Sequence, residues 1–319
     1  MKRLLLKSEH YMRIYLNNLN ESWVVDKLKK EWIDSYSQFT TNKISNSDIV
    51  WIIAPWLWKK IPRRHLKRKK VICSIYHIDF SKFDENQENE FILRDSYVDQ
   101  YHVISEKTKH DLKKLTQKKI ISIPFWVNQN KFFSIENKAD LRSKFGFSEK
   151  DILIGSFQRD TEGSDLVSPK LIKGPDILFN ILDKEFKKNP NTKVVLAGKR
   201  RQFIIGLLEK NNIPYKYFEM VDEDKLNLLY NILDLYIVSS RLEGGPQAII
   251  ECAISKTPII STNVGVSPEI LSSDSIFNSL KEYEYAKPNI EFAYNNAKKY
   301  TLKKGMKLFE EMFRELYEN

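Results

Sequence analysis

The feature that most constrains the fold is an alternation of short apolar runs with amphipathic stretches along the whole chain of 319 residues. Runs of five to seven residues stand at 3–7, 48–54, 70–76, 100–105, 119–124, 151–157, 193–198, 215–219, 234–240 and 258–263. Helical spacing fills the segments between them, for example at 106–116, 174–188, 200–211, 222–233 and 246–255. Continuously apolar strands that alternate with helices are typical of parallel sheets covered on both faces. We therefore predict an α/β chain with two Rossmann-like, doubly wound sheets.

The length of the chain predicts more than one domain, because 319 residues exceed what a single hydrophobic core usually holds. A polar, mixed stretch at 124–151 separates the two sets of strands. We place the boundary there, with an N-terminal domain at 1–132 and a C-terminal domain at 133–300. The strongly amphipathic end of the chain, within 301–319, is predicted to form a helix that packs back on the N-terminal domain.

Composition excludes several classes of protein. No apolar run approaches the roughly 18 residues of a membrane-spanning helix, and the N-terminal apolar stretch is too short for a signal peptide. Cys73 and Cys252 are far apart in apolar segments, which favours reduced core thiols over a disulfide or a metal cluster. The expected location is cytoplasmic.

The basic segment, residues 56–70, contains most of the net charge of +10. It has Trp56 and Trp58 at its start and then eight cations without an acid: Lys59, Lys60, Arg63, Arg64, Lys67, Arg68, Lys69 and Lys70. Aromatic anchors beside cations suit an anionic membrane surface. The alternative is a solvated helix whose tryptophans pack inward, and nucleic acid is a weaker third choice because no known binding pattern accompanies the segment.

A candidate phosphate site lies in the stretch RLEGGPQAIIECA at 241–253. It follows a buried strand and begins a helix, with Pro246 at the favoured first position. A helix N-terminus presents unpaired N–H groups and a partial positive charge, and Gly244 and Gly245 let a ligand approach the backbone closely.

Two carboxylates flank this turn. Glu243, in the loop, is positioned to accept hydrogen bonds from hydroxyls beyond the phosphates, and Glu251, on the second turn of the helix, is expected to reach ribose hydroxyls. Taken singly, Glu243 is equally compatible with a loop carboxylate near a helix dipole, and Glu251 with an exposed helical acid.

These motifs resemble a known family. EGGPQAIIE at 243–251 resembles the Glu-x7-Glu motif of retaining nucleotide-sugar glycosyltransferases with the GT-B fold, family 4 type. STNVGVSPEIL at 261–271 resembles the family's Gly-Gly-x-Pro-Glu segment, IGSFQRD at 154–160 its strand ending in Gly-Arg, and KGPDIL at 173–178 its Lys-Gly helix start. Segments 194–201 and 217–240 follow in family order, so the resemblance covers about residues 150–275.

The resemblance implies roles for individual residues. Arg159 and Lys173 would hold the diphosphate of the donor, Glu243 its sugar and Glu251 its ribose. The other donor-binding positions would be Gly244, Gly245, Pro246, Gln247, Tyr217, Phe218 and Met220, the last three near the base. Two fixed cations and a helix N-terminus can stabilise a leaving diphosphate, so no metal and no cofactor are expected.

The N-terminal half resembles the family through VICSIYHID at 71–79, which is similar to the strand that ends in a His facing the donor sugar. His77 is therefore a catalytic candidate, with a packed or solvated histidine as the alternative. The chain departs from the family pattern at Gln158 and Val266, each of which stands where a Gly is usual, and in a first strand that leads into no glycine-rich loop.

The expected function is that of a glycosyltransferase, which moves a sugar from a nucleotide-diphosphate sugar to a glycan or lipid-linked acceptor with retention and without a metal. It would be peripheral to the inner face of a membrane if the basic segment binds there. The alternative is a catalytically inactive GT-B-like binding or scaffold subunit, which would be expected to lose some of Arg159, Lys173, Glu243 and Glu251. All four are present. A dinucleotide-dependent oxidoreductase or epimerase would need a Gly-x-Gly-x-x-Gly after a strand, and the sequence has none.

Overall fold

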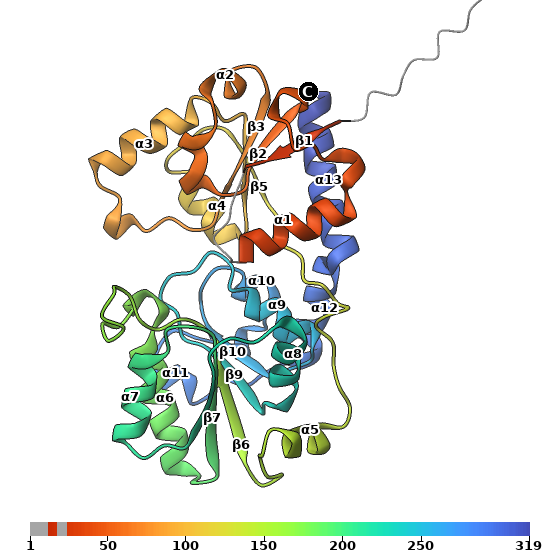
Figure 1. Cartoon of the computed structure of the whole chain (residues 1–319). Helices are drawn as coiled ribbons and strands as arrows, with labels where there is room; N and C mark the ends of the chain where they lie inside the picture. Colours follow the sequence, from red (N-terminus) through yellow and green to blue (C-terminus); the bar gives the residue numbers. More distant parts are fainter. Residues whose placement is uncertain (1–11, 18–23) are drawn as a thin grey trace, which may run out of the picture. The chain divides into compact units, whose positions relative to one another are not determined.

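The computed structural model describes residues 12–17 and 24–319 and divides into two units, each with its own parallel sheet (Figure 1). The N-terminal unit contains the described residues up to Val103, then Lys109–Ile123 and Met306–Asn319. The C-terminal unit contains Ile104–Thr108 and Pro124–Gly305. The predicted α/β class with two Rossmann-like sheets is confirmed.

The sheet of the N-terminal unit has the strand order β1-β2-β3-β4-β5, with all pairs parallel. The bounds are β1 Ile14–Leu16, β2 Ile49–Ile52, β3 Lys70–Ile75, β4 Gln100–Val103 and β5 Lys119–Ser122. Every residue of β2 is buried, as expected of a strand covered on both faces. The strand predicted at 3–7 lies outside the described residues. The described strand β1 was not predicted, because its three residues are too few to show a pattern.

Helices cover both faces of this sheet. On one face, Trp58 after β2, Leu66 of α2 (Arg63–Leu66) and Phe91 of α3 (Glu85–Asp95) join the strand side chains in one buried cluster. On the other face, Trp32 of α1 (Val24–Ser35) lies 5.4 Å from Phe313 of α13 (Leu302–Glu318), ring centre to ring centre. The amphipathic end of the chain thus buries its apolar stripe in the core of the N-terminal unit. The short helix α4 is Glu106–Leu112.

The sheet of the C-terminal unit has the order β11-β10-β9-β6-β7-β8, also entirely parallel. The strands are β6 Ile152–Ser156, β7 Thr192–Ala197, β8 Tyr215–Phe218, β9 Leu235–Val238, β10 Ile259–Thr262 and β11 Ile276–Phe277. All five strands predicted in this half are present, and the two-residue β11 was not predicted.

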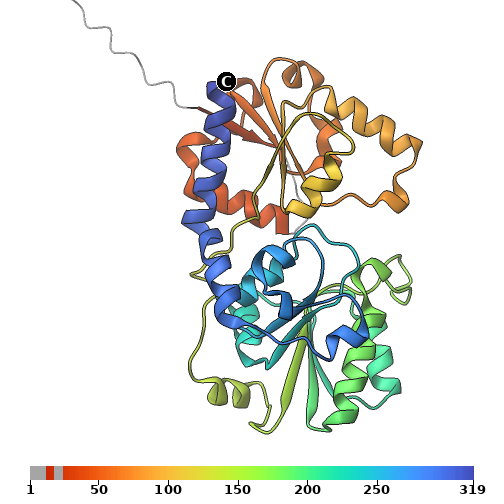
Figure 2. The same ribbon diagram turned by 180° about the vertical axis from the view of Figure 1, so that it is seen from behind.

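Figure 2 shows the helices of the C-terminal unit on the two faces of its sheet. One face is covered by α6 (Pro175–Lys188), α7 (Gln202–Lys210) and α11 (Leu280–Tyr283). The other carries α8 (Glu223–Ile232), α9 (Gln247–Ile254), α10 (Ser267–Ile270) and α12 (Ile290–Ala297), while α5 (Lys138–Lys144) packs on α8. A side-chain cap fixes the start of helix α8: the Asp222 side chain accepts a 2.8 Å hydrogen bond from the Lys225 N–H.

The main part of the C-terminal unit begins at Pro124, nine residues before residue 133, where we predict the start of the C-terminal domain from the sequence. The reason for this difference is that apolar residues within the polar stretch pack against the C-terminal unit. Phe132 packs against Tyr230 with ring centres 6.1 Å apart, and the carbonyl of Trp126 accepts a 2.8 Å hydrogen bond from the Gln247 side chain. These contacts tie 124–132 to the second core.

Candidate donor site

The candidate site lies at the carboxyl ends of β6 and β9, which are neighbours at the point where the strand order reverses. From β6 the chain proceeds outward to β7 and β8, then returns to β9 and proceeds the other way to β10 and β11. The connections therefore leave in opposite directions and open a crevice, which is where ligands of open α/β sheets bind. The loops after β6 and after β9 carry Arg159 and Glu243.

Lys173 and Glu243 form an ion pair in this site, with Lys173 Nζ donating to Glu243 Oε1. The side chains are only 23% and 14% exposed, so the pair is partly shielded from water. Two backbone bonds hold their loops together, because the Arg241 and Leu242 N–H groups donate to the Ile172 carbonyl at 2.8 and 3.1 Å. The structure therefore brings these two predicted residues into direct contact.

The turn that carries Lys173 depends on Gly174. This glycine has φ +60°, in the left-handed region, and initiates α6 with Pro175 at its first position. A Cβ at position 174 would lie 1.8 Å from the Ser239 carbonyl oxygen. Only glycine lets the Lys173 turn approach the loop after β9 this closely.

Arg159 lies in the loop that follows β6, and its Nε donates to the Thr161 carbonyl at 2.6 Å. Lys170 belongs to the same group, because its N–H donates to the Asp160 carbonyl at 2.8 Å. Desolvation, followed by the charges of Arg159 and Lys173, lowers the pKa of Lys170. The positive charges of Arg159, Lys170 and Lys173 therefore lie close enough to interact.

Lys170 was not predicted as a site residue. It carries no sequence signal of its own, since 29% of the chain is charged and a lone lysine in a polar loop looks like any surface cation. Only the tertiary structure shows that Lys170 lies near Arg159 and Lys173.

A buried ion pair lies beneath this loop. Arg201 Nε and Asp160 Oδ2 are 3.0 Å apart, and neither side chain is more than 2% exposed. Burial raises the pKa of Asp160 to about 6, while the charge of Arg201 acts in the opposite direction. Arg201 Nη1 also donates to the Gln158 carbonyl, so a rigid, charged anchor supports the segment that presents Arg159.

The Gly-Gly-Pro turn leads into α9, with Pro246 as the cap and Gln247 as the first helical residue. Gly265, at φ +48°, packs directly on this turn: a Cβ there would lie 2.3 Å from the Gly244 carbonyl oxygen. The turn is therefore held from behind by the loop after β10, which explains the glycine at 265 in the segment 261–271.

Glu251 is buried on α9, with 7% of its surface exposed, and its Oε2 accepts a 2.8 Å hydrogen bond from the Tyr230 hydroxyl. The alternative of an exposed helical acid is wrong. A buried carboxylate next to an aromatic cluster is costly unless it is hydrogen-bonded, and Tyr230 supplies one partner. Ribose binding by Glu251 stays a prediction.

The predicted base region lies at the end of the edge strand β8. The Tyr217 hydroxyl donates to the Gly198 carbonyl at 3.0 Å, and Lys225 Nζ lies 5.2 Å from the centre of the Phe218 ring. Met220 is 65% exposed beyond the strand. The strand order puts β7 between these residues and the loop of Arg159, so their contact with a base stays a prediction.

His77 belongs to the other unit. It follows β3 and is exposed. The structure thus brings together Arg159, Lys173, Glu243 and the turn at 244–247 within the C-terminal unit, and it presents His77 from the carboxyl end of the N-terminal sheet.

The basic segment divides into a buried and an exposed part. Trp58 is 1% exposed and packs in the core with Ile61 and Leu66, whereas Trp56 is 42% exposed. Lys59 is tied to Glu90 at 2.8 Å. The inward-packing alternative therefore describes Trp58 but not Trp56. Six of the eight cations are exposed: Lys59, Lys60, Arg63, Arg64, Lys67 and Arg68.

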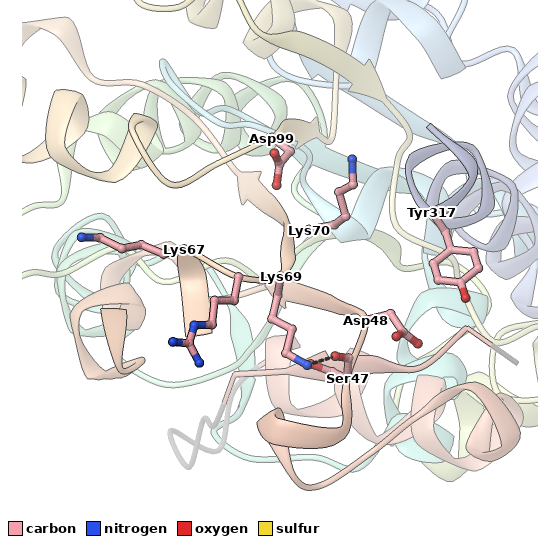
Figure 3. A pocket seen from close by; sticks show the side chains of 8 residues that line it. Ser47, Asp48, Lys67, Lys69, Lys70, Asp99 and Tyr317 are labelled. Carbon is pink, nitrogen blue, oxygen red and sulfur yellow. Dashed lines mark hydrogen bonds between the residues drawn. The ribbon is translucent and has the colours of Figure 1, made fainter. Parts of the chain in front are cut away.

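The end of this segment lines a polar pocket of about 470 Å³ (Figure 3). Lys69 Nζ donates there to the Ser47 carbonyl, and the Asp99 carboxylate accepts a 2.7 Å bond from the Val71 N–H. The pocket lies at the amino ends of β2, β3 and β4. Ligands of open α/β sheets bind at the opposite, carboxyl edge of the sheet. We therefore assign these side chains a structural role, in which they bond main-chain groups at the amino ends of the strands.

In the described parts of the chain no helix is long and apolar enough to cross a membrane. A search of curated proteins found no match. Residues 168–301 match the family model of glycosyl transferases group 1. This matched segment includes Lys173, Glu243 and Glu251.

Solved structures share the fold across nearly the whole chain. A crystal structure of Anabaena Alr3699/HepE in complex with UDP has a TM-score of 0.75 at 11% identity, covering 95% of this chain and 100% of that one. Sucrose-phosphate synthase (tll1590) from Thermosynechococcus elongatus has 0.69 at 13% identity, covering 94% and 81%. A glycosyltransferase from Rickettsia africae ESF-5 has 0.61 at 19% identity, covering 95% and 84%. The family match therefore applies to residues 168–301, and the fold of the chain is the one that these solved structures share.

Proposed function

We propose that the protein is a glycosyltransferase that takes its sugar from a uridine-diphosphate sugar and transfers it to a glycan or lipid-linked acceptor. The observation that carries the proposal is the Lys173–Glu243 ion pair at the carboxyl ends of β6 and β9, beside Arg159 and the start of α9. Structures of Alr3699/HepE with UDP and with UDP-glucose support uridine as the first base to test.

The ion pair has a chemical use in this reaction. A nucleoside diphosphate gains negative charge as the bond to the sugar breaks, and fixed cations in a shielded site stabilise that charge. Lys173 would exchange Glu243 for the diphosphate when the donor binds, because a diphosphate carries more charge than a single carboxylate. Glu243 would then be free to accept hydrogen bonds from the sugar hydroxyls.

Retention and metal independence belong to the same proposal. Arg159, Lys170 and Lys173 supply the positive charge that the leaving diphosphate needs, so no metal is required for that step. Retention is proposed because the motif at 243–251 resembles that of retaining enzymes; the acceptor would then attack from the face that the diphosphate leaves.

We also propose that the enzyme is cytoplasmic and binds peripherally to an anionic membrane surface. The six exposed cations of the basic segment and the outward-facing Trp56 support this location. Cations near an anionic surface contribute roughly 1 kcal/mol each. A lipid-linked acceptor would then be concentrated near the N-terminal unit.

The test is the substitution Lys173→Ala, measured by calorimetric titration with UDP and by release of glucose from UDP-glucose. Loss of a charge-assisted hydrogen bond costs about 1.5–3 kcal/mol, so UDP affinity should fall at least about tenfold, with a matching loss of turnover. Lys184→Ala is the matched control, since Lys184 also forms an ion pair, with Glu284, but on the surface of α6.

Equal UDP affinity in the native chain and in both variants would contradict the assignment of Lys173. UDP binding without any glucose release or transfer would instead favour the catalytically inactive binding subunit.

A further inference from the structure

Gln158 links three loops of the donor site through its side-chain amide. Nε2 donates to the Lys173 carbonyl at 2.7 Å and to Ser239 Oγ at 3.1 Å. Oε1 accepts a 3.1 Å hydrogen bond from Ser240 Oγ. One side chain at the end of β6 therefore connects the turn before α6 with the loop after β9.

The orientation of this amide is determined by its partners. The Lys173 carbonyl can only accept, so the nitrogen of the amide has to face it, and the oxygen then faces Ser240. The main chain of Gln158 is equally fixed, because its carbonyl accepts from Arg201, whose guanidinium is buried against Asp160. Gln158 is thus a rigid connector rather than a mobile surface side chain.

The connection continues to the two charged residues of the site. Ser240 Oγ lies 3.1 Å from Gln158 Oε1 and 3.1 Å from Glu243 Oε1, and its single hydroxyl proton can serve either acceptor. Glu243 Oε1 also receives the Lys173 ammonium. Gln158 therefore contacts the main chain of Lys173 directly and the carboxylate of Glu243 through Ser240, which closes a ring around the ion pair.

We propose that Gln158 is a positioning residue that holds the Lys173 ammonium and the Glu243 carboxylate in place before a donor binds. It acts through these residues and not by touching the donor, because both of its amide N–H groups are used within the protein. This inference rests on the proposed function only for the identity of the ligand that Lys173 and Glu243 bind.

The first test needs no ligand. Acetylation of individual lysines by acetic anhydride, followed by peptide mass spectrometry, measures how firmly each ammonium is held. Gln158→Ala should raise the rate at Lys173 about threefold or more, because hydrogen bonds of about 1 kcal/mol each no longer fix its turn. The rate at Lys184 should stay unchanged. Gln158→Met, which keeps the volume and removes the same bonds, gives a second variant if the alanine variant folds poorly.

The matched control is Gln202→Ala, a change of the same residue type at an exposed position of α7 in the same unit. It should alter no lysine rate. A general loosening of the fold would raise the rates at Lys173 and Lys184 together in Gln158→Ala, and that result would overturn the proposal. An unchanged rate at Lys173 in both Gln158 variants would overturn it as well.

The second test is a double-mutant cycle with UDP. Gln158→Ala should weaken UDP binding about tenfold in the native background and less than about twofold in the Lys173→Ala background. In the second case the Lys173 ammonium is already absent, so loss of its positioning cannot lower UDP affinity further. An equal loss in both backgrounds would contradict positioning. If the native chain binds no UDP while Gln158→Ala still exposes Lys173 to acetylation, the uridine donor fails and the positioning role stands.

Discussion

The substitution Gly174→Ala tests whether the left-handed turn at 174 holds the donor site together. Gly174 has φ +60°, and a non-glycine residue in this region costs roughly 1–2 kcal/mol. The added Cβ would also lie 1.8 Å from the Ser239 carbonyl oxygen, well inside any real contact, so the turn before α6 and the loop after β9 would have to move apart. We therefore expect a loss of at least about 2 kcal/mol in the free energy of unfolding.

Gly206→Ala is the matched control for this change. Gly206 lies within α7 of the same unit, and a Cβ there would meet nothing within 4 Å. Alanine favours a helix interior by about 0.5–1 kcal/mol over glycine. The same chemical change should therefore stabilise the chain at 206 and destabilise it at 174.

Thermal unfolding followed by circular dichroism measures both effects. A loss of about 2 kcal/mol lowers the melting temperature by roughly 4–8 °C for a domain of this size. Because Lys173 directly precedes the glycine, UDP affinity measured at a temperature where Gly174→Ala is folded should fall as well. A variant with native stability and native UDP affinity would refute the argument from the turn. So would equal destabilisation by Gly174→Ala and Gly206→Ala.

Three further predictions concern catalysis, acid stability and membrane binding. Glu243→Gln should mainly lower turnover of UDP-glucose and Glu251→Gln should mainly weaken donor binding, because a ribose contact is the same in ground and transition states; identical changes in kcat and KM would contradict this division. Burial lowers the pKa of His102 to about 4, from 6.5, so the unfolded chain gains this proton first as the pH falls, and about 3 kcal/mol of stability is lost between pH 6.5 and 4. Urea unfolding at pH 7 and pH 4.5 should show a smaller acid loss in His102→Gln than in the native chain, and an equal loss would rule out His102 as its source. The native chain should sediment with anionic vesicles at 0.1 M salt and less at 1 M, as the Debye length shortens from about 10 Å to 3 Å. Pelleting should be weaker for a variant in which glutamine replaces Lys59, Lys60, Arg63 and Arg64. If neither protein pellets, the membrane is excluded as a binding partner.

Periodicity and turn chemistry in the sequence were enough to predict the α/β class and most strands. Continuous apolar runs, such as 234–240, indicate a strand buried on both faces wherever it lies in the sheet. The Gly-Gly-Pro turn likewise predicts a helix start at Pro246 from local geometry alone, and α9 begins one residue later, at Gln247. Both signals belong to a few consecutive residues, so they survive without any knowledge of the neighbours.

The sequence alone could not show which strands are neighbours, and the site depends on that. The order β9-β6-β7 brings the loops after β6 and β9 together, although many residues separate them in the chain. Only this adjacency joins Lys173 to Glu243 and places Gln158 between their loops. At the level of sequence, Gln158 is merely a departure from a family pattern.

Burial of polar groups was decided in the same way. Glu251 has the spacing of an exposed helical acid, yet α9 turns it toward Tyr230 in the core. The main part of the second unit begins at Pro124 and not at residue 133, because apolar residues after Ile123, which look like part of a linker in the sequence, pack in the second core. Amphipathic spacing indicates which face of a segment is apolar, but packing between distant elements determines which partner covers this face. For that reason only the tertiary structure shows which residues form the site.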